Sequence, residues 1–221
     1  MPMNILAIET SSDACSAALS LGNEVVEVFR VAPRAHTQLI LPMMEEVLAQ
    51  ADVSLQQLDA LAFGRGPGAF TGVRVATSVI QGVALGVDLP VIPVSSLAAL
   101  AHYGFRLEGY EQSIVAVDAR LGEVYTACYA IDDGYAELIG QEHVLKPEAL
   151  PQVAPGQWLA IGNAWSVYAQ ALTQQVDDVV LTKTLSDVYP HAHDVACLAR
   201  FGQQVAAEHA LPVYLRDKVT S

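Results

Sequence analysis

A set of three consecutive β-strand patterns occurs twice in this chain, and this repeat constrains the fold more than any other feature of the sequence. In each set the first apolar strand ends in an acidic residue, Glu9 in the first set and Asp118 in the second. The turns that follow are Thr10-Ser11-Ser12-Asp13 and Gly22-Asn23 in the first set, and Leu121-Gly122 and Asp132-Asp133-Gly134 in the second. The second set begins at residue 113, which is 109 residues after the first set begins at residue 4. The predicted strands span 4–9, 14–21 and 24–30 in the first set and 113–118, 123–130 and 135–141 in the second.

The repeat continues beyond these strands. Apolar strands that end in glycine follow at 61–64 and 159–162, and a helical pattern comes after each of them. A duplicated βββαβα unit of the α/β class is the economical interpretation. Two facing halves of this kind form the architecture shared by actin, sugar kinases and Hsp70-type ATPases, in which nucleotide phosphates lie between the two first hairpin turns. Chance similarity among short apolar strands is the alternative interpretation.

The duplication also predicts where the chain divides. We expect a first actin-like half over 1–105, which carries two amphipathic helices, and a second half over 106–221. A last helix is predicted from Ala192 to about His209. This helix is a candidate to pack back toward the first half.

Charge and composition exclude several classes of protein. The chain has 24 acidic and 11 basic residues, and its net charge of −13 repels the phosphate backbone of nucleic acids. No uninterrupted apolar run reaches about 18 residues, and the first residues lack the basic region of a signal peptide. The cysteines, Cys15, Cys128 and Cys197, form no CxxC motif, which suits a reducing compartment. We therefore expect a cytoplasmic protein with buried, unreactive thiols and no membrane partner.

The second helix of the first half, over 70–86, is apolar around more than half of its circumference, which predicts burial against the sheet. The opposite side is a narrow stripe of mixed character. A solvated surface explains this stripe, but its small residues and one leucine also suit close approach by another helix. The stripe consists of Arg74, Ser78, Gln81 and Leu85, beside Gly82.

A glycine-rich segment lies between the strand at 61–64 and this helix. Glycines in such a place can form an anion-binding loop at the positive end of a helix. The Lys-Ser/Thr pair of a Walker A motif is absent, however, and the proline removes one backbone donor. A tight turn from strand to helix is therefore the favoured interpretation. The segment consists of Gly64, Arg65, Gly66, Pro67 and Gly68.

Two turns could serve a nucleotide in an actin-like fold. Thr10, Ser11 and Ser12 could present hydroxyl and amide donors to a phosphate, although hydroxyls are common in hairpin turns. In the second half, Asp118 could contribute to Mg²⁺ or substrate binding. The alternative, which we favour, is an ion pair of Arg120 with Asp118 or Glu123 that stiffens the turn.

Metal and nucleophile motifs are absent from the sequence. The six histidines form no HxxxH or HExxH pair, and there is no Gly-x-Ser-x-Gly motif. His191-Ala192-His193-Asp194 could chelate a metal in principle, but a third ligand is not evident, so a loop that begins a helix is the better interpretation. We expect no metal site and no catalytic residues.

Several motifs, taken in order, resemble the TsaB (YeaZ) family. Each motif is weak alone, but their order and spacing are specific, and they span nearly the whole chain. The segments are Ile8-Glu9-Thr10-Ser11, His36-Thr37-Gln38, Leu41-Pro42-Met43, Gly64-Arg65-Gly66-Pro67-Gly68, Phe70-Thr71-Gly72-Val73-Arg74, Val94-Ser95-Ser96-Leu97, Asp118-Ala119-Arg120-Leu121-Gly122-Glu123-Val124-Tyr125, Lys146-Pro147-Glu148, Gly162-Asn163 and Pro212-Val213-Tyr214-Leu215-Arg216.

The resemblance implies the duplicated actin-like fold and a role in making threonylcarbamoyladenosine (t6A) in tRNA. Members of this family are required partners of TsaD, which transfers the threonylcarbamoyl group to tRNA, and the ATPase TsaE joins them. In the TsaD-like paralogue an HxxxH pair holds the metal, and those two positions read Ser96 and Leu100 here. The resemblance therefore implies a noncatalytic scaffold or activating subunit, which contacts tRNA only through the complex.

The helices of the first half are expected to supply the docking face for the transferase, and the same face is expected to form a homodimer when the partner is absent. No tightly bound cofactor is expected. Binding of ATP or ADP at the interface with the partner is an open alternative. The alternatives are an actin-like phosphotransferase or ATPase and a peptidase. The predicted interface consists of His36, Leu39, Ile40, Met43, Arg74, Ser78, Gln81, Gly82 and Leu85.

Overall fold

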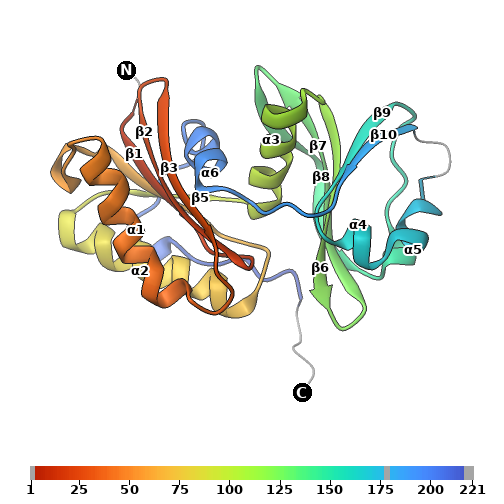
Figure 1. The fold of residues 1–221 in the computed structure, drawn as a ribbon, viewed down its shortest axis with the longest axis horizontal. Helices are drawn as coiled ribbons and strands as arrows, with labels where there is room; N and C mark the ends of the chain where they lie inside the picture. The colour runs from red at the N-terminus through yellow and green to blue at the C-terminus, as the bar shows by residue number, and fades with distance from the viewer. Residues whose placement is uncertain (1–2, 177–179, 217–221) are drawn as a thin grey trace. The chain divides into compact units, whose positions relative to one another are not determined.

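The computed structural model describes residues 3–176 and 180–216, which form two compact units, each built on a five-stranded sheet (Figure 1). One unit comprises Met1–Ala99 and Pro190–Val213, and the other comprises Leu100–Tyr189 and Tyr214–Ser221. The change from one unit to the other therefore falls inside a helix, after Ala99, and the segment from Pro190 belongs with the first sheet.

In chain order, the first sheet and its helices are β1 (Ile5–Glu9), β2 (Ala14–Leu21), β3 (Glu24–Val31), α1 (His36–Gln50), the 3-10 helix η1 (Leu55–Gln57), β4 (Ala60–Gly64), α2 (Phe70–Val87) and β5 (Val91–Val94). The helix α3 (Ser96–Glu108) follows. Then come β6 (Gln112–Arg120), β7 (Glu123–Asp132), β8 (Tyr135–Leu145), η2 (Pro147–Ala149), β9 (Gln157–Ile161), α4 (Ala164–Val167), α5 (Ala169–Thr173), β10 (Val180–Leu185), α6 (Ala192–Ala199) and η3 (Ala207–His209).

The two sheets have the same topology. The first has the order β3-β2-β1-β4-β5, and the second has the equivalent order β8-β7-β6-β9-β10. In each sheet the first three strands pair antiparallel, whereas the last two join in parallel. The predicted duplicated α/β fold is thereby confirmed, because the repeat extends from strand order to strand direction.

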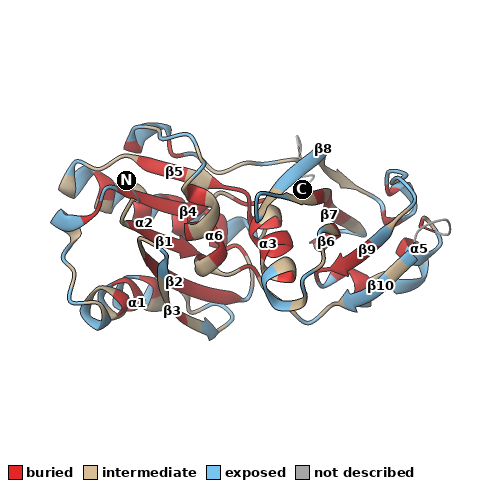
Figure 2. Ribbon diagram, turned by 90° about the horizontal axis from the view of Figure 1, so that it is seen from above, coloured by how far each residue is buried: buried red, intermediate tan, exposed pale blue. Residues whose placement is uncertain are grey.

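Helices cover both faces of the first sheet. Successive residues of β1 face opposite sides and therefore belong to different core clusters. Leu6 and Ile8 belong to a core cluster with α1 and α2, whereas Ile5 and Ala7 belong to a second cluster with α6. All five residues of β1 and of β4 are buried, as the red strands of Figure 2 show. The strands β1 and β4 are therefore internal, whereas β3 at one edge of the sheet is partly exposed.

The second sheet is also packed on both faces. Trp158 and Trp165 lie in a cluster that includes α4 and α5, and the indole of Trp165 donates a hydrogen bond to the carbonyl of Ile114 at 3.1 Å. On the other face, α3 lies so close to β9 that a Cβ at Gly104 would come within 2.6 Å of Leu159. Glycine at this position permits the close approach of helix and sheet.

The prediction of one helix from Ala192 to about His209 is wrong in its length. α6 ends at Ala199, and only the short η3 follows at Ala207–His209. Between them, Val205 forms an antiparallel bridge with Val91 of β5, with hydrogen bonds of 2.8 and 2.9 Å. Gly202 lies so close to Ile92 that a Cβ there would overlap its side chain. Pairing with the sheet therefore replaces helical hydrogen bonds in this segment.

Within the described residues, one helix is long and apolar enough to cross a membrane by length and composition alone. This is α2, whose mean hydropathy is 1.4 and of which 39% is buried in the fold. Core helices of globular proteins meet the same criterion. In this fold α2 packs through Ala76, Ile80 and Ala84 against the first sheet.

Candidate functional site

The first hairpin turn, predicted as a phosphate-binding element, is used internally. The Thr10 hydroxyl donates a 2.7 Å hydrogen bond to the carbonyl of Gly72, and the amide of Ala69 donates to the carbonyl of Ser11 at 2.7 Å. The hydroxyl of Ser12 accepts the amide of Ala14 at 3.2 Å. Thr10 and Ser11 are buried. The turn thus anchors the start of α2.

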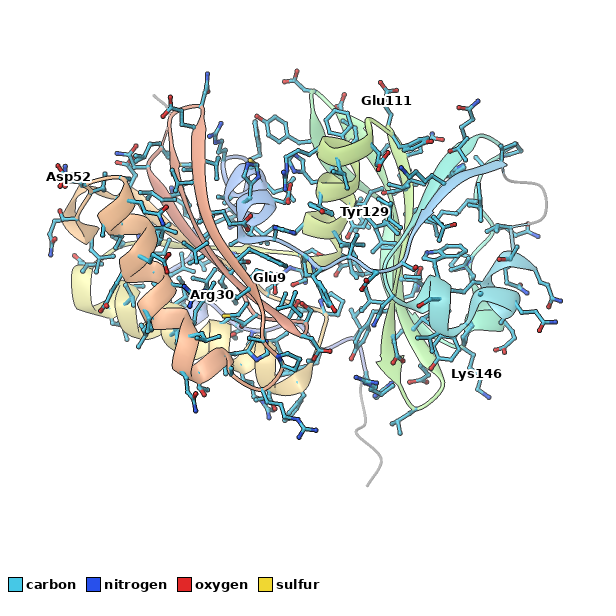
Figure 3. The ribbon with its side chains drawn as sticks, viewed as in Figure 1. Glu9, Arg30, Asp52, Glu111, Tyr129 and Lys146 are labelled. Carbon is cyan, nitrogen blue, oxygen red and sulfur yellow. The ribbon has the colours of Figure 1, made fainter. Side chains whose placement is uncertain are left out.

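Glu9 is the last residue of β1, and its carboxyl group is buried (Figure 3). Its Oε1 accepts the amide of Ser11 at 2.5 Å, and its Oε2 accepts the hydroxyl of Ser96 at 2.7 Å. Burial raises the pKa of this carboxyl, and the hydrogen bonds from Ser96 and Ser11 oppose that shift. The carboxyl group links the end of β1 to the beginning of α3, a contact between residues 87 positions apart that no sequence motif indicates.

The glycine-rich segment is a packed turn. The amide of Arg65 donates to the carbonyl of Val94, and the carbonyl of Gly66 accepts the amide of Ser96. A Cβ at Gly64 would overlap the Glu9 carboxylate, and one at Gly68 would lie within 2.7 Å of the Ser11 side chain. Gly66 and Pro67 are buried. The strand-to-helix turn favoured from the sequence is therefore what the structure contains.

Asp118 lies at the second hairpin, in the second unit, and its side chain is mostly buried. Its Oδ1 accepts the amide of Arg120 at 2.9 Å and the Tyr168 hydroxyl at 3.1 Å. Its Oδ2 lies 3.3 Å from the Arg120 guanidinium. The predicted ion pair is confirmed for Asp118, and Glu123 instead accepts a 2.9 Å hydrogen bond from Arg216.

The histidines at the start of α6 have structural partners. The Nδ1 of His191 lies 2.9 Å from Glu27 Oε2, and Glu27 Oε1 accepts the amide of His193 at 3.1 Å. The Nδ1 of His193 lies 3.8 Å from both the Asp194 carboxylate and the Cys197 sulfur. These contacts raise the pKa of His193 to about 9, with Asp194 as the largest cause and burial in opposition.

Metal-binding geometry is not found in the described part of the chain, where no three His, Cys, Asp or Glu side chains gather to hold an ion. The thiols differ in burial: Cys15 is buried as expected, but Cys128 and Cys197 are only half-buried. Burial raises the pKa of the Cys15 and Cys128 thiols to about 11, so both are protonated at neutral pH.

Most residues of the predicted stripe on α2 are exposed, and one is half-buried. Arg74, Ser78, Gly82 and Leu85 are exposed, and 70% of Leu85 is accessible to solvent. Gln81 is half-buried, because its side-chain amide donates to the carbonyl of Ala210 at 3.1 Å. A Cβ added at Gly82 would meet nothing within 4 Å. The stripe is therefore an exposed surface with small residues at its centre.

The predicted residues of α1 lie mainly on its inner side. Ile40 and Met43 are fully buried in the core that α1 shares with the sheet, and Leu39 packs partly against that core. The Nε2 of His36 contacts the carbonyl of Ser12 at 2.8 Å. The outer side of α1 instead exposes Leu41, of which 48% is accessible.

Two exposed hydrophobic residues, Leu41 of α1 and Phe70 of α2, were not among the interface residues predicted from the sequence. Phe70 begins α2 with 50% of its surface accessible, and the Arg74 guanidinium lies 3.3 Å from its ring centroid. α1 and α2 contact each other on the same side of the sheet (Figure 1). We call the outward surface of the two helices the outer helical face, and define it by Leu41, Phe70, Arg74, Ser78, Gly82 and Leu85.

Comparison with known proteins decides the family. A family model described as TsaD, tRNA N6-adenosine threonylcarbamoyltransferase, matches residues 28–220. The tRNA threonylcarbamoyladenosine biosynthesis protein TsaB of Escherichia coli (strain K12) is 42% identical over 98% of this chain and 96% of its own length. The chain belongs to the TsaB family.

Other members of the TsaB family agree with this assignment. The protein of the same name in Haemophilus influenzae is 38% identical over 99% of this chain and 95% of its own length. The solved structure of YeaZ from Pseudomonas aeruginosa is 42% identical, with a TM-score of 0.91, over 97% of this chain and 100% of that chain. Sequence and fold therefore identify the same family across both units.

The two positions where the resemblance predicts metal ligands in TsaD are structural in this TsaB-family chain. Ser96 donates its hydroxyl to Glu9, and only 1% of Leu100 is accessible to solvent. A hydroxyl in an internal hydrogen bond and a buried aliphatic side chain do not provide the imidazole nitrogens that a histidine pair would offer.

Proposed function

We propose that this chain is a noncatalytic subunit that takes part in forming t6A in tRNA, by binding and activating a TsaD-type transferase through the outer helical face. The t6A role follows from the names of its relatives in the TsaB family and from the match to the TsaD family model. The docking role is our own inference. In the absence of the transferase, the same face forms a homodimer.

The observation that carries this proposal is the combination of apolar and small residues on the outer helical face. Leu41, Phe70 and Leu85 are the exposed large hydrophobic residues of α1 and α2, and Ser78 and Gly82 leave room between them for another helix. Small residues let a helix approach closely, while exposed apolar side chains gain free energy when they are buried at an interface.

The internal use of the actin-like turns supports a noncatalytic role. The amides of Ser11 and Ala69 and the hydroxyl of Thr10 are each committed to partners within the first unit. A phosphate at this turn would have to compete for these donors. We accordingly propose that ATP is hydrolysed by the transferase or by a TsaE-type ATPase that joins the complex. Any ATP or ADP that contacts this chain would bind at its interface with the partner.

Copurification with a TsaD-type transferase tests the docking role, with Leu85→Glu as the informative variant. We expect the wild-type chain to form a stoichiometric complex, and the variant to lose most of it, because the charge would be desolvated at the interface. Leu138→Glu is the matched control, since Leu138 is also exposed, at 44%, but lies on β8. Equal loss in both variants, or none in either, would contradict docking through α2.

A reconstituted modification assay tests the activating role. The transferase alone, the transferase with this chain, and the transferase with Leu85→Glu are compared for incorporation of threonylcarbamoyl into tRNA. We expect activity to require the wild-type chain and to fall in proportion to complex formation in the variant. Full activity of the transferase without this chain would remove the activating role.

Contact with tRNA is proposed to occur only within the complex. A net charge of −13 provides little of the counterion release that drives binding to nucleic acids. We expect the free chain to retain no tRNA in a filter-binding assay at physiological salt, whereas the assembled complex retains it. Submicromolar binding by the free chain would contradict this part of the proposal.

A further inference from the structure

A groove lies at the C-terminal end of α2, next to the outer helical face. Its volume is about 440 Å³, and Leu85 at its edge belongs to both surfaces. One wall is formed by the last turn of α2 and the residues after it, and the other by the segment 204–208. Both walls belong to the first unit. A molecule bound to the outer helical face at Leu85 would therefore reach the groove without leaving the surface.

The walls of the groove are held in place by hydrogen bonds. Val205 pairs with Val91 of β5 through two backbone hydrogen bonds, and Gln81 of α2 holds the carbonyl of Ala210 beyond η3. Asp88 ends α2 in the left-handed conformation, with φ of 55°, and the amide of Leu89 donates to the carbonyl of Ala84. A groove fixed in this way loses little conformational entropy when a partner binds.

The lining of the groove combines an apolar floor with a negative rim. Ala84 and Ala207 are buried at its base, while the carboxylates of Asp88 and Glu208 are exposed at its edge. The C-terminal end of α2 adds the negative pole of an 18-residue helix. None of the described residues that line the groove is a lysine or an arginine. A side chain with an apolar stem and a positive tip complements this arrangement, because such a side chain buries its methylene groups and keeps its charge at the rim.

We infer that the groove receives a lysine or arginine side chain of the transferase-type partner that docks on the outer helical face. The inference rests on the proposed function, and it adds the chemistry of a second contact point. Leu85 supplies the apolar contact, and Asp88 and Glu208 select a basic residue beside it. The partner must therefore present a positive side chain next to the helix that packs over Ser78 and Gly82.

Binding measurements on the full chain test this inference. The variant Asp88→Asn/Glu208→Gln removes both charges, and asparagine tolerates the left-handed backbone at 88. The matched control is Asp133→Asn/Glu137→Gln, in which Asp133 also has a positive φ, of 46°, and Glu137 is exposed on β8. Affinity for the transferase is measured by surface plasmon resonance at low and high salt, and unfolding temperatures check that all variants are folded.

We expect the groove variant to bind the transferase about tenfold more weakly at low salt, with a smaller salt dependence than the wild type, whereas the control stays within about twofold. A double-mutant cycle should then couple the groove variant to one basic residue of the transferase. Unchanged affinity and salt dependence would overturn the inference. So would a groove variant that weakens only the homodimer, because the occupant would then be a second copy of this chain.

The proposed function and this inference fail in different ways. If Leu85→Glu abolishes the complex while the groove variant binds like the wild type, docking stands and the basic contact is wrong. If the wild-type chain does not bind the transferase at all, both are wrong.

Discussion

The hydroxyl of Ser96 donates a 2.7 Å hydrogen bond to the carboxylate of Glu9 in the interior of the first unit. The position where the resemblance predicts a metal-ligating histidine in TsaD thus holds, in this chain, a donor to a buried acid. The bond joins the start of α3 to the end of β1, beside Gly64. In this member of the TsaB family the region is a structural junction.

Glu9→Gln should change how stability depends on pH. Burial raises the pKa of Glu9 above its ordinary value of 4.5. The folded chain therefore holds this proton more tightly than the unfolded chain, so the wild type loses stability as pH rises from 4.5 to the folded pKa. Glutamine cannot ionise and escapes that loss. In urea unfolding from pH 4 to 8, the stability of Glu9→Gln relative to the wild type should rise with pH.

Glu46→Gln is the control for this titration, because Glu46 of α1 forms an exposed ion pair, at 2.8 Å, with Arg30 of β3. Exposed ion pairs contribute little to stability, so this variant should follow the wild type closely. A constant difference between Glu9→Gln and the wild type at every pH would show that Glu9 does not titrate as described.

Gly64→Ala should strongly destabilise the first unit. The added methyl group would overlap the Glu9 carboxylate and lie 2.9 Å from the Ser96 hydroxyl. Because these atoms are buried and hydrogen-bonded, relief of the clash requires breaking the junction, at a cost on the order of 3 kcal/mol. The loss is measured by urea unfolding, with Gly86→Ala as the control, where an added Cβ would meet no atom within 4 Å. Wild-type stability in Gly64→Ala would mean that the junction can rearrange freely.

The fold could be predicted from the sequence because its signals are local. Strand alternation and glycine turns lie within short windows, and the structure has β2 at Ala14–Leu21 and α2 at Phe70–Val87, close to the predicted spans. The end of α6 could not be predicted in this way, because it is set by pairing between Val205 and Val91, which are far apart in the chain. A helical pattern does not reveal a competing strand.

The candidate site was predicted in part for the same reason. The period of α2 correctly separated its buried side from the stripe around Ser78. On α1 the apolar stripe with Ile40 and Met43 turned out to face the sheet of its own unit, because periodicity identifies an apolar side but not the surface that it meets. Phe70 and Leu41 lie off both apolar stripes, so their exposure became visible only in the folded chain.

His193→Gln should remove a pH-dependent contribution of His193, on α6, to the free energy of unfolding. The pKa of His193 rises from 6.5 to about 9, mainly through Asp194 and then Cys197. A raised pKa means that protonated His193 stabilises the fold; this contribution is complete below pH 6.5 and disappears as pH rises through 9. In urea unfolding, the variant should therefore be less stable than the wild type at pH 6, and the difference should shrink by pH 9. His209→Gln, at an exposed position in η3, is the control variant.

Substitutions at the centre of the outer helical face should affect the stability of the monomer and the affinity of the homodimer in different ways. At Gly82 an added methyl group meets no atom within 4 Å, so Gly82→Ala should raise the free energy of unfolding of the monomer by about 0.5–1 kcal/mol through helix propensity. The same methyl group, and far more the side chain of Ser78→Arg, would obstruct a helix that packs closely here. Analytical ultracentrifugation should show both variants weakening the homodimer, on the order of 2–5 kcal/mol for Ser78→Arg, while Ser78→Ala associates like the wild type. If Ser78→Arg sediments as the wild type does and supports full modification activity, this stripe is only a solvated surface.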